Sequence, residues 1–240
     1  MSFLLQAMNW GVYYSMRYYE QAIDCGDGGD FTMWVLYQFQ SRTNYEILVE
    51  WQVWRLLTPG YVHANFDHIY GNMMSIFFTS IILEWQLGPK KLFGLYNFTV
   101  FFGNISSGLY QPYSIGMGAS TAVYSFYGAI FGAALRQKYG MRTETNMVIL
   151  LPVAYYSINL LISNFEGSGD TVIHASGWTQ GLLYVILLLP DLHFQGGSLN
   201  TDYRDLLYFG SFGLLLGGNL LQLILYLTAI QPLQFDYYDC

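Results

Sequence analysis

Six apolar stretches of about 20 residues constrain this chain more than any other feature of its sequence. A helix of that length crosses the hydrocarbon core of a bilayer, which is about 30 Å thick. Only 10% of the 240 residues are charged, against about 25% in average soluble domains. We therefore predict an all-α, polytopic membrane helix bundle, with spans at residues 69–87, 92–111, 116–135, 146–163, 171–190 and 206–230.

One more helix is predicted at residues 3–22, which brings the number of spans to seven. This segment carries several polar and charged side chains, including Arg17 and Glu20. An amphipathic helix lying at the membrane surface is therefore the alternative to a span. No internal repeat or linker divides the chain, and we describe it as a weak first helix (1–23), an interfacial loop (24–66), core helices two to six (67–190) and an inner loop, seventh helix and tail (191–240).

The basic residues predict the orientation of the bundle. With seven spans, the loops on the side of the N-terminus hold most of them, and the opposite face has only Arg42 and Arg55. Lys and Arg are enriched in cytoplasmic loops. We therefore expect the N-terminus on the inner side, together with Lys90, Lys91, Arg136, Lys138, Arg142 and Arg204.

Charge and cysteine content exclude some functions. The net charge is −7 and no run of Lys or Arg occurs, whereas nucleic-acid binding depends on basic groups that neutralise phosphates. The two cysteines, Cys25 and Cys240, lack the spacing of metal ligands. We predict no nucleic-acid partner, no metal and no cofactor.

Ser120 and His174 are the predicted reacting pair. If the helices at 116–135 and 171–190 both start at the outer face, Ser120 and His174 lie roughly 5 Å below it, at about 1.5 Å rise per residue. A serine hydroxyl becomes a good nucleophile when an adjacent base takes its proton, and imidazole suits that role. A lone serine in such a helix usually donates a hydrogen bond to its own helix backbone instead. The prediction therefore depends on His174 lying at the same depth as Ser120.

Other side chains could support this pair. His68 and Asn72 are four residues apart, hence on one helical face, and with the Ser120 N–H they could donate hydrogen bonds to an oxyanion. Tyr124, one turn after Ser120, could support the His174 ring, although interface and core aromatics have the same pattern.

These motifs together resemble the rhomboid family. The resemblance covers residues 51–190 and consists of ordered motifs with fitting distances between them. The motifs are Trp54-Arg55, His63-x4-His68-x3-Asn72-Met73, Glu84, Gly118-x-Ser120, Tyr124, and His174-x2-Gly177-x3-Gly181. The resemblance implies a six-helix core, here followed by one C-terminal transmembrane helix.

The same resemblance implies an intramembrane serine endopeptidase that cuts transmembrane segments of other membrane proteins without metal or cofactor. Ser120 would be the nucleophile and His174 the general base, without a carboxylate. His68, Asn72 and the Ser120 N–H would form the oxyanion hole beside Gly118, and Tyr124 would stack near His174. The residues with an implied structural role are Trp54, Arg55, His63, Glu84, Gly177 and Gly181.

One position departs from the family pattern. The family's Gly-x-Ser-Gly reads Gly-Ala-Ser-Thr here, so Thr121 places a β-branched side chain where glycine permits close approach. We expect it to crowd the contact between the helices at 116–135 and 171–190 or to tilt the Ser120 N–H.

Two other functions are open at this point. A rhomboid fold with an inactive site could be a structural subunit of a larger membrane complex. A transporter or channel is disfavoured because paired intramembrane carboxylates and broken-helix repeats do not occur. The protease would have the bilayer and transmembrane proteins as partners, and both the mitochondrial inner membrane and the secretory-pathway membranes fit the sequence.

Overall fold

The computed structural model describes residues 1–24, 29–137, 155, 170–188 and 201–234. Every regular element in these ranges is helical, which confirms the all-α prediction. The predicted span at 146–163 lies outside the described residues, apart from Tyr155.

The long helices coincide with the predicted ones in the described part of the chain. They are α1 (Ser2–Ala22), α4 (Phe66–Leu87), α5 (Pro89–Tyr110), α6 (Ser120–Gln137), α8 (Asp170–Leu188) and α9 (Thr201–Ala229). The predicted loop at 24–66 contains short helices, namely α2 (Met33–Gln38), α3 (Asn44–Leu48) and the 3₁₀ turns η1 (Val53–Leu56) and η2 (Thr58–Tyr61). Among the described residues, one segment, Tyr208–Ala229, has both the length and the apolar composition of a membrane span.

One predicted boundary is wrong in a way that matters for the site. The helix expected from residue 116 begins at Ser120. Gly118 has φ +112°, a backbone conformation that a right-handed helix cannot include and that glycine adopts at little cost. Ser120 is therefore the first residue of its helix and does not lie one turn inside it.

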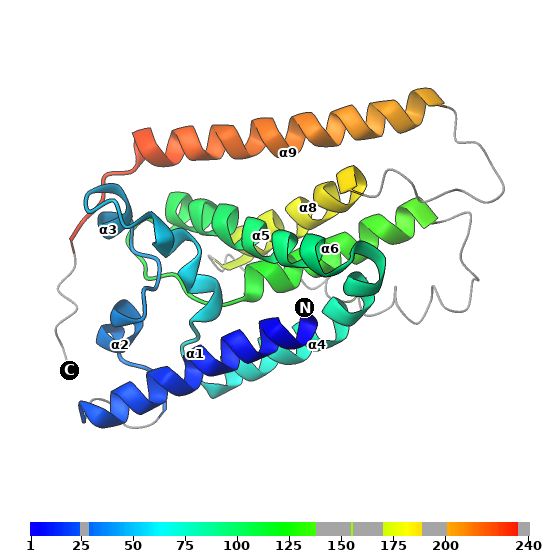
Figure 1. The fold of residues 1–240 in the computed structure, drawn as a ribbon. Helices are drawn as coiled ribbons and strands as arrows, with labels where there is room; N and C mark the ends of the chain where they lie inside the picture. Colours follow the sequence, from blue (N-terminus) through cyan, green and yellow to red (C-terminus); the bar gives the residue numbers. More distant parts are fainter. Residues whose placement is uncertain (25–28, 138–154, 156–169, 189–200, 235–240) are drawn as a thin grey trace.

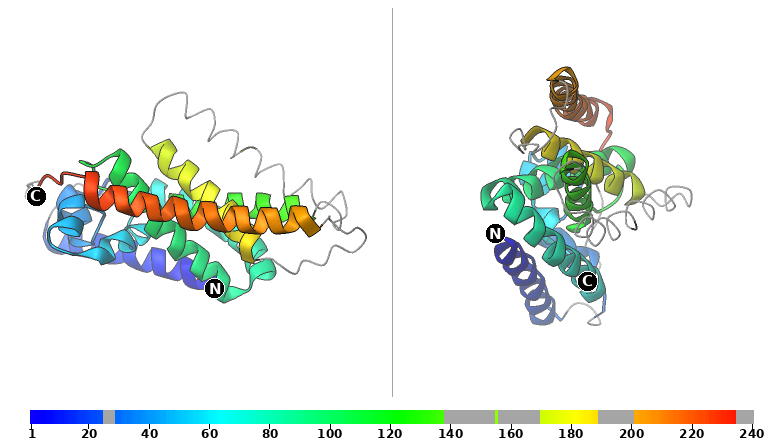
Figure 2. Two further views of the ribbon diagram at one scale, coloured as in Figure 1. Left: turned by 90° about the horizontal axis from the view of Figure 1, so that it is seen from above. Right: turned by 90° about the vertical axis from the view of Figure 1, so that its right-hand side faces the viewer.

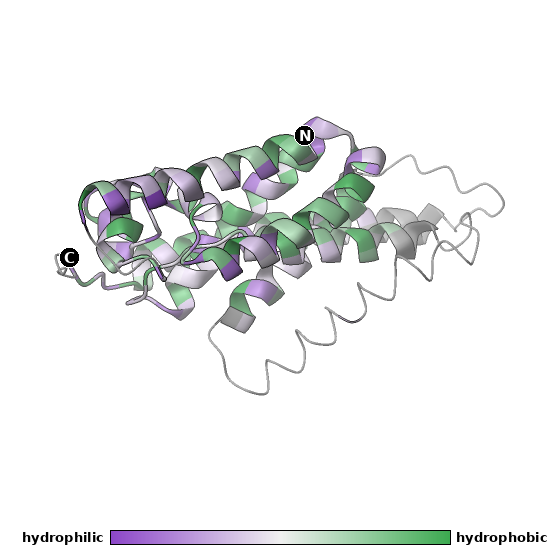
Figure 3. Ribbon diagram, turned by 90° about the horizontal axis from the view of Figure 1, so that it is seen from below, coloured by the Kyte–Doolittle hydropathy of each residue, from purple (hydrophilic) through white to green (hydrophobic). Residues whose placement is uncertain are grey.

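The helices form a bundle with α9 on one side and α1 with α4 on the other, and α5, α6 and α8 lie between them (Figure 1). The end-on view in Figure 2 shows the same order. The core is formed by buried apolar side chains such as Leu92, Leu95 and Phe126. Figure 3 shows that hydrophobic residues also extend over much of the outer surface of the long helices.

Glycines allow α6 and α8 to touch along their backbones. A Cβ atom at Gly181 of α8 would overlap the Ser125 carbonyl oxygen of α6, and one at Gly128 of α6 would overlap the Trp178 carbonyl oxygen of α8. At Gly177 a Cβ would overlap the Thr121 carbonyl oxygen. Small residues at such spacing let membrane helices approach closely, so these glycines fix how α6 and α8 lie against each other.

Polar contacts stabilise the segment before α4 internally, and others join α1 to α4. The buried Arg55 donates to the Ser41 carbonyl oxygen at 2.9 Å, and Trp54 Nε1 donates to Gln40 Oε1 at 2.8 Å. At the far end of α4, Glu84 accepts hydrogen bonds from the Ser2 backbone N–H at 2.9 Å and the Ser2 hydroxyl at 2.6 Å.

Candidate active site

Ser120 lies between two cavities. The smaller, of about 230 Å³, extends toward α5, and the larger, of about 430 Å³, lies between α4, α6 and α8. Four residues line both: His68, Met117, Ser120 and His174. The starts of α4, α6 and α8 therefore meet at one end of the bundle, and the two predicted reacting side chains share the same open space.

The start of α6 places a backbone donor beside the Ser120 hydroxyl. The first N–H groups of a helix have no acceptor within that helix, and the positive end of the helix dipole favours negative charge there. Ser120 is the first residue of α6. Its N–H group therefore belongs to a set of donors suited to an anion at the cavity.

The His174 ring stacks on Tyr124. Their ring centroids are 4.3 Å apart and the planes differ by 21°. Tyr124 belongs to α6, one turn after Ser120, and His174 is near the start of α8. The stacking limits rotation of the imidazole and keeps it on the α6 side, facing the cavity that Ser120 lines.

His68 and Asn72 lie one turn apart on α4, both on the wall of the larger cavity. The Asn72 side chain is buried, and its Nδ2 has no hydrogen-bond partner among the described residues. A Cβ atom at Gly118 would come within 2.7 Å of the His68 ring and 3.8 Å of Asn72 Nδ2. The residue at Gly118 must therefore lack a side chain so that its backbone can lie against these two groups.

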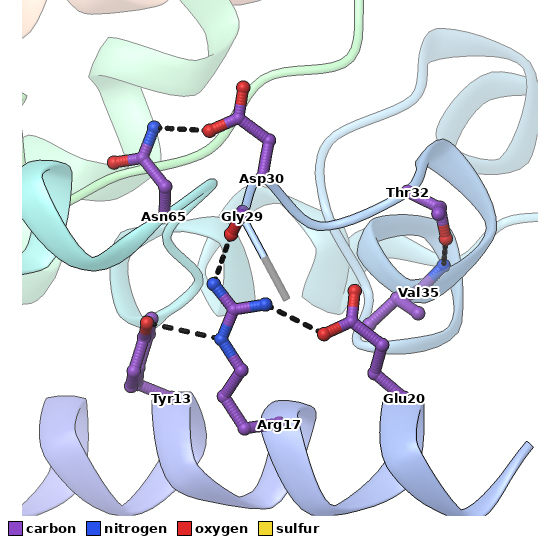
Figure 4. A network of polar contacts seen from close by, with 8 residues as sticks. All are labelled: Tyr13, Arg17, Glu20, Gly29, Asp30, Thr32, Val35 and Asn65. Atoms are coloured by element: carbon purple, nitrogen blue, oxygen red, sulfur yellow. Dashed lines mark hydrogen bonds and ion pairs between the residues drawn. The ribbon is translucent and has the colours of Figure 1, made fainter. Parts of the chain in front are cut away.

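The start of α4, which carries His68, is capped by Asn65. Figure 4 shows the polar contacts that join Asn65 to Asp30, and Arg17 of α1 to Gly29. Asn65 Oδ1 accepts the His68 backbone N–H at 2.8 Å, and Asn65 Nδ2 donates to Asp30 Oδ1 at 2.7 Å. Arg17 of α1 donates to the neighbouring Gly29 carbonyl oxygen and pairs with Glu20 at 2.6 Å. An asparagine N-cap typically stabilises a helix start by about 1 kcal/mol, so this chain of contacts fixes the position of His68.

His63 supports the turn that leads into α6. Its Nε2 accepts the Ala119 N–H at 3.4 Å, and its ring meets the His68 ring edge-on with centroids 5.1 Å apart. Burial, with a smaller contribution from His68, lowers the pKa of His63 to about 3. His63 is therefore neutral at physiological pH, which leaves Nε2 able to accept this hydrogen bond.

Thr121, the residue expected to crowd the contact between α6 and α8 or to tilt the Ser120 N–H, lies against two glycines. A Cβ atom at Gly103 of α5 would overlap its methyl group, and a Cβ atom at Gly177 of α8 would overlap its carbonyl oxygen and come within 3.0 Å of the same methyl group. The absence of a side chain at Gly103 provides the space that the β-branched residue needs. Thr121 thus fills a gap between α5, α6 and α8.

Several cavity residues were missed by the sequence analysis. Met117 lines both cavities. Asp67, which its position beside His68 in the sequence would place off the face of His68 and Asn72, lines the larger cavity with them. The wall of the smaller cavity is polar where α5 ends, with Asn104 and Ser107 on the helix and Gln111 directly after it. Their spacing of three and four residues places them on one helical face within a predicted membrane span, a signal that could have identified them.

A family profile and the relatives of known sequence point to the same family. The family profile described as Rhomboid domain matches residues 50–191. Similar proteins include Rhomboid-like protease 3 of Toxoplasma gondii, 28% identical over 56% of this chain and 51% of the relative, and RHOMBOID-like protein 1 of Arabidopsis thaliana, 28% identical over 70% and 46%. A third is the putative rhomboid protease YdcA of Bacillus subtilis (strain 168), 30% identical over 58% and 67%. The chain spans about half the length of the first two relatives.

The packing of Thr121 leads to a prediction about stability. Thr121→Gly removes a side chain that fills buried space against Gly103, so we expect the free energy of unfolding to fall by about 1–3 kcal/mol. The matched control is Thr228→Gly, at an exposed position on α9, where the helix propensity changes by about 0.5 kcal/mol and one exposed hydrogen bond to the Ile224 carbonyl oxygen is lost. Thermal unfolding of the purified variants measures both. Equal losses in the two variants would show that Thr121 fills no space that matters.

Proposed function

This chain belongs to the rhomboid family and is therefore an integral membrane protein, and we propose that it is an intramembrane serine endopeptidase in which Ser120 and His174 act as a catalytic dyad. Its substrates are transmembrane segments of other membrane proteins. The reaction takes place at the end of the bundle where α4, α6 and α8 begin.

The observation that carries this proposal is the shared position of Ser120 and His174. Both side chains line the same two cavities, and Tyr124 holds the His174 ring by stacking at 4.3 Å. A substrate peptide bond placed over Ser120 would have room for chain on both sides, since one cavity lies on each side of the hydroxyl. This arrangement suits a nucleophile that attacks an extended backbone.

In the first half of the reaction, the Ser120 oxygen attacks the substrate carbonyl carbon while His174 accepts the hydroxyl proton. The carbonyl oxygen becomes an oxyanion, which accepts hydrogen bonds from the Ser120 N–H, Asn72 Nδ2 and the His68 ring. The protonated His174 then donates its proton to the leaving amine. The C–N bond breaks, and the remaining acyl group is bound to Ser120 as an ester.

In the second half, water enters through the open cavities and attacks the ester. His174 takes a proton from the water and returns it to the Ser120 oxygen as the C–O bond breaks. The products are a carboxylic acid and an amine, and the hydroxyl and the imidazole are back in their starting forms. Every step uses protons and electron pairs from the dyad, the substrate and water alone.

The first experiment tests peptide cleavage. The full chain is reconstituted in liposomes with a reporter that carries a single transmembrane segment containing small and helix-destabilising residues, and product is measured over time. We expect cleavage by the native chain, a fall to background in Ser120→Ala and a loss of at least about 100-fold in His174→Ala.

Matched controls use the same substitutions elsewhere. Ser15→Ala removes an exposed hydroxyl on α1, and His193→Ala removes a histidine outside the motifs, so both should cleave at the native rate. Cleavage that persists in Ser120→Ala would exclude the dyad. A chain that cleaves nothing and remains stable only with partner subunits would favour the structural role in a larger complex.

Asn72 Nδ2, which has no hydrogen-bond partner in the described part of the chain, leads to a second prediction. If Nδ2 donates to the oxyanion, Asn72→Ala should lower kcat by about 100- to 1,000-fold, as the loss of one such donor does in other serine proteases. Thr79→Ala is the control, because Thr79 is a buried polar residue on the same helix that lines neither cavity. Cleavage rates at saturating substrate decide the matter, and a native rate in Asn72→Ala would contradict the assigned role.

A further inference from the structure

A buried polar cluster connects α9 to the segment that leads into Ser120. The cluster consists of Arg42, Asn44 and Tyr226, with exposed fractions of 0%, 4% and 1%. Arg42 and Asn44 precede the catalytic core in the chain, whereas Tyr226 is near the end of α9. Two distant parts of the sequence therefore meet in this cluster.

Arg42 holds the segment between α5 and α6. Its backbone pairs with Gly116 in both directions, with Arg42 N–H to the Gly116 carbonyl oxygen at 2.8 Å and Gly116 N–H to the Arg42 carbonyl oxygen at 3.0 Å. Its guanidinium donates to the Ser114 carbonyl oxygen at 2.8 Å and to the Gln111 carbonyl oxygen at 3.3 Å. Arg42 therefore fixes residues 111–116 along most of their length.

Asn44 connects Arg42 to the end of α5. Its Nδ2 donates at 3.0 Å to the carbonyl oxygens of Gly108 and Pro112, which lie where α5 ends and carbonyl groups have no partner within the helix. Its Oδ1 accepts from Arg42 Nη1 at 2.9 Å and from the Tyr226 hydroxyl at 2.9 Å. The side-chain oxygen thus uses both of its lone pairs.

Tyr226 is the contribution of α9. Its ring lies against the backbone of Gly108, where a Cβ atom would overlap it. Most of the large apolar side chains of α9 are exposed, including Phe209, Leu214 and Leu221, so the helix touches the bundle along a narrow stripe. Ser106 of α5 donates to Gln222 one turn earlier, at 3.2 Å. The Tyr226 hydroxyl and the Gln222 amide are thus two polar attachments of α9 to the bundle.

Gly116 is followed directly by the residues that shape the site. Residues 115–118 line the smaller cavity, and the Gly118 backbone lies against His68. Ser120 follows four residues after the Arg42 bridge. A shift of the 111–116 segment would therefore move Gly118 and the start of α6 relative to His174 on α8.

We propose that Tyr226 is a positioning residue: through Asn44 and Arg42, its hydroxyl holds the 111–118 segment in the arrangement that Ser120 needs for reaction. This inference rests on the proposed function for its kinetic consequence. It assigns to α9, which follows the matched domain, a part in catalysis at a site that α9 does not line.

The test compares Tyr226→Phe with Tyr208→Phe in the full chain. Both remove one hydroxyl from α9, but Tyr208 is 41% exposed and lies outside the cluster. We expect Tyr226→Phe to lower kcat for the liposome reporter by about 3- to 10-fold, the range that one hydrogen bond allows. KM should stay within about twofold, because a positioning effect acts on reaction rather than on binding. Tyr208→Phe should match the native chain.

Hydrogen exchange gives a second readout that does not need activity. The Gly116 N–H donates to the Arg42 carbonyl oxygen and the Gly118 N–H to the Pro59 carbonyl oxygen. Both amides should therefore exchange faster in Tyr226→Phe than in the native chain, and at the native rate in Tyr208→Phe. If these amides exchange at native rates in Tyr226→Phe, the positioning role is wrong whether or not the chain cleaves. Faster exchange in a chain that cleaves nothing would support the attachment and count against the proposed function alone. Faster exchange together with a native kcat would overturn the catalytic consequence.

Discussion

The arrangement of the site depends on direct backbone contact between α6 and α8. Gly177 lies against the Thr121 carbonyl oxygen and Gly181 against the Ser125 carbonyl oxygen. Thr121 follows Ser120 directly, and Gly177 comes three residues after His174. The glycine contacts therefore set the register that brings a serine and a histidine, 54 positions apart in the chain, to the wall of one cavity. A side chain at either glycine would separate the two helices and with them the two groups.

Residues around this contact position the other groups of the site. Gly118 permits a positive φ and a close approach to His68, so the chain can turn sharply and begin α6 at Ser120. Asn65 caps α4 at His68 and is tied through Asp30 to the region that α1 holds. Polar groups are costly in an apolar bundle. Most of those that position the site, such as Asn65, are hydrogen-bonded, while several buried side-chain atoms among the described residues have no partner. Asn72 Nδ2 is one of these atoms and lies on the wall of the larger cavity, where a bound ligand or intermediate can supply the partner.

The sequence predicted the helices of the described part of the chain well, because hydropathy reports length and burial. The roles of the site residues stay predictions, although His68, Ser120 and His174 do line the same cavities. The start of α6 was missed, since residues 115–119 continue the apolar run and nothing in hydropathy reveals the φ of Gly118. The fit of Thr121 was also missed, because the space it uses comes from Gly103 on another helix. Tyr226 was one of 22 tyrosines, and only the packing of α9 distinguishes it from the others.

The most direct test of a reactive Ser120 is intact-mass analysis of the purified chain after treatment with a fluorophosphonate, followed by mapping of the modified peptide. The account predicts a single adduct on Ser120 that is lost in His174→Ala, because the hydroxyl needs the imidazole as its base. An unmodified native chain, an adduct on another serine, or equal modification of Ser120 without His174 would contradict it.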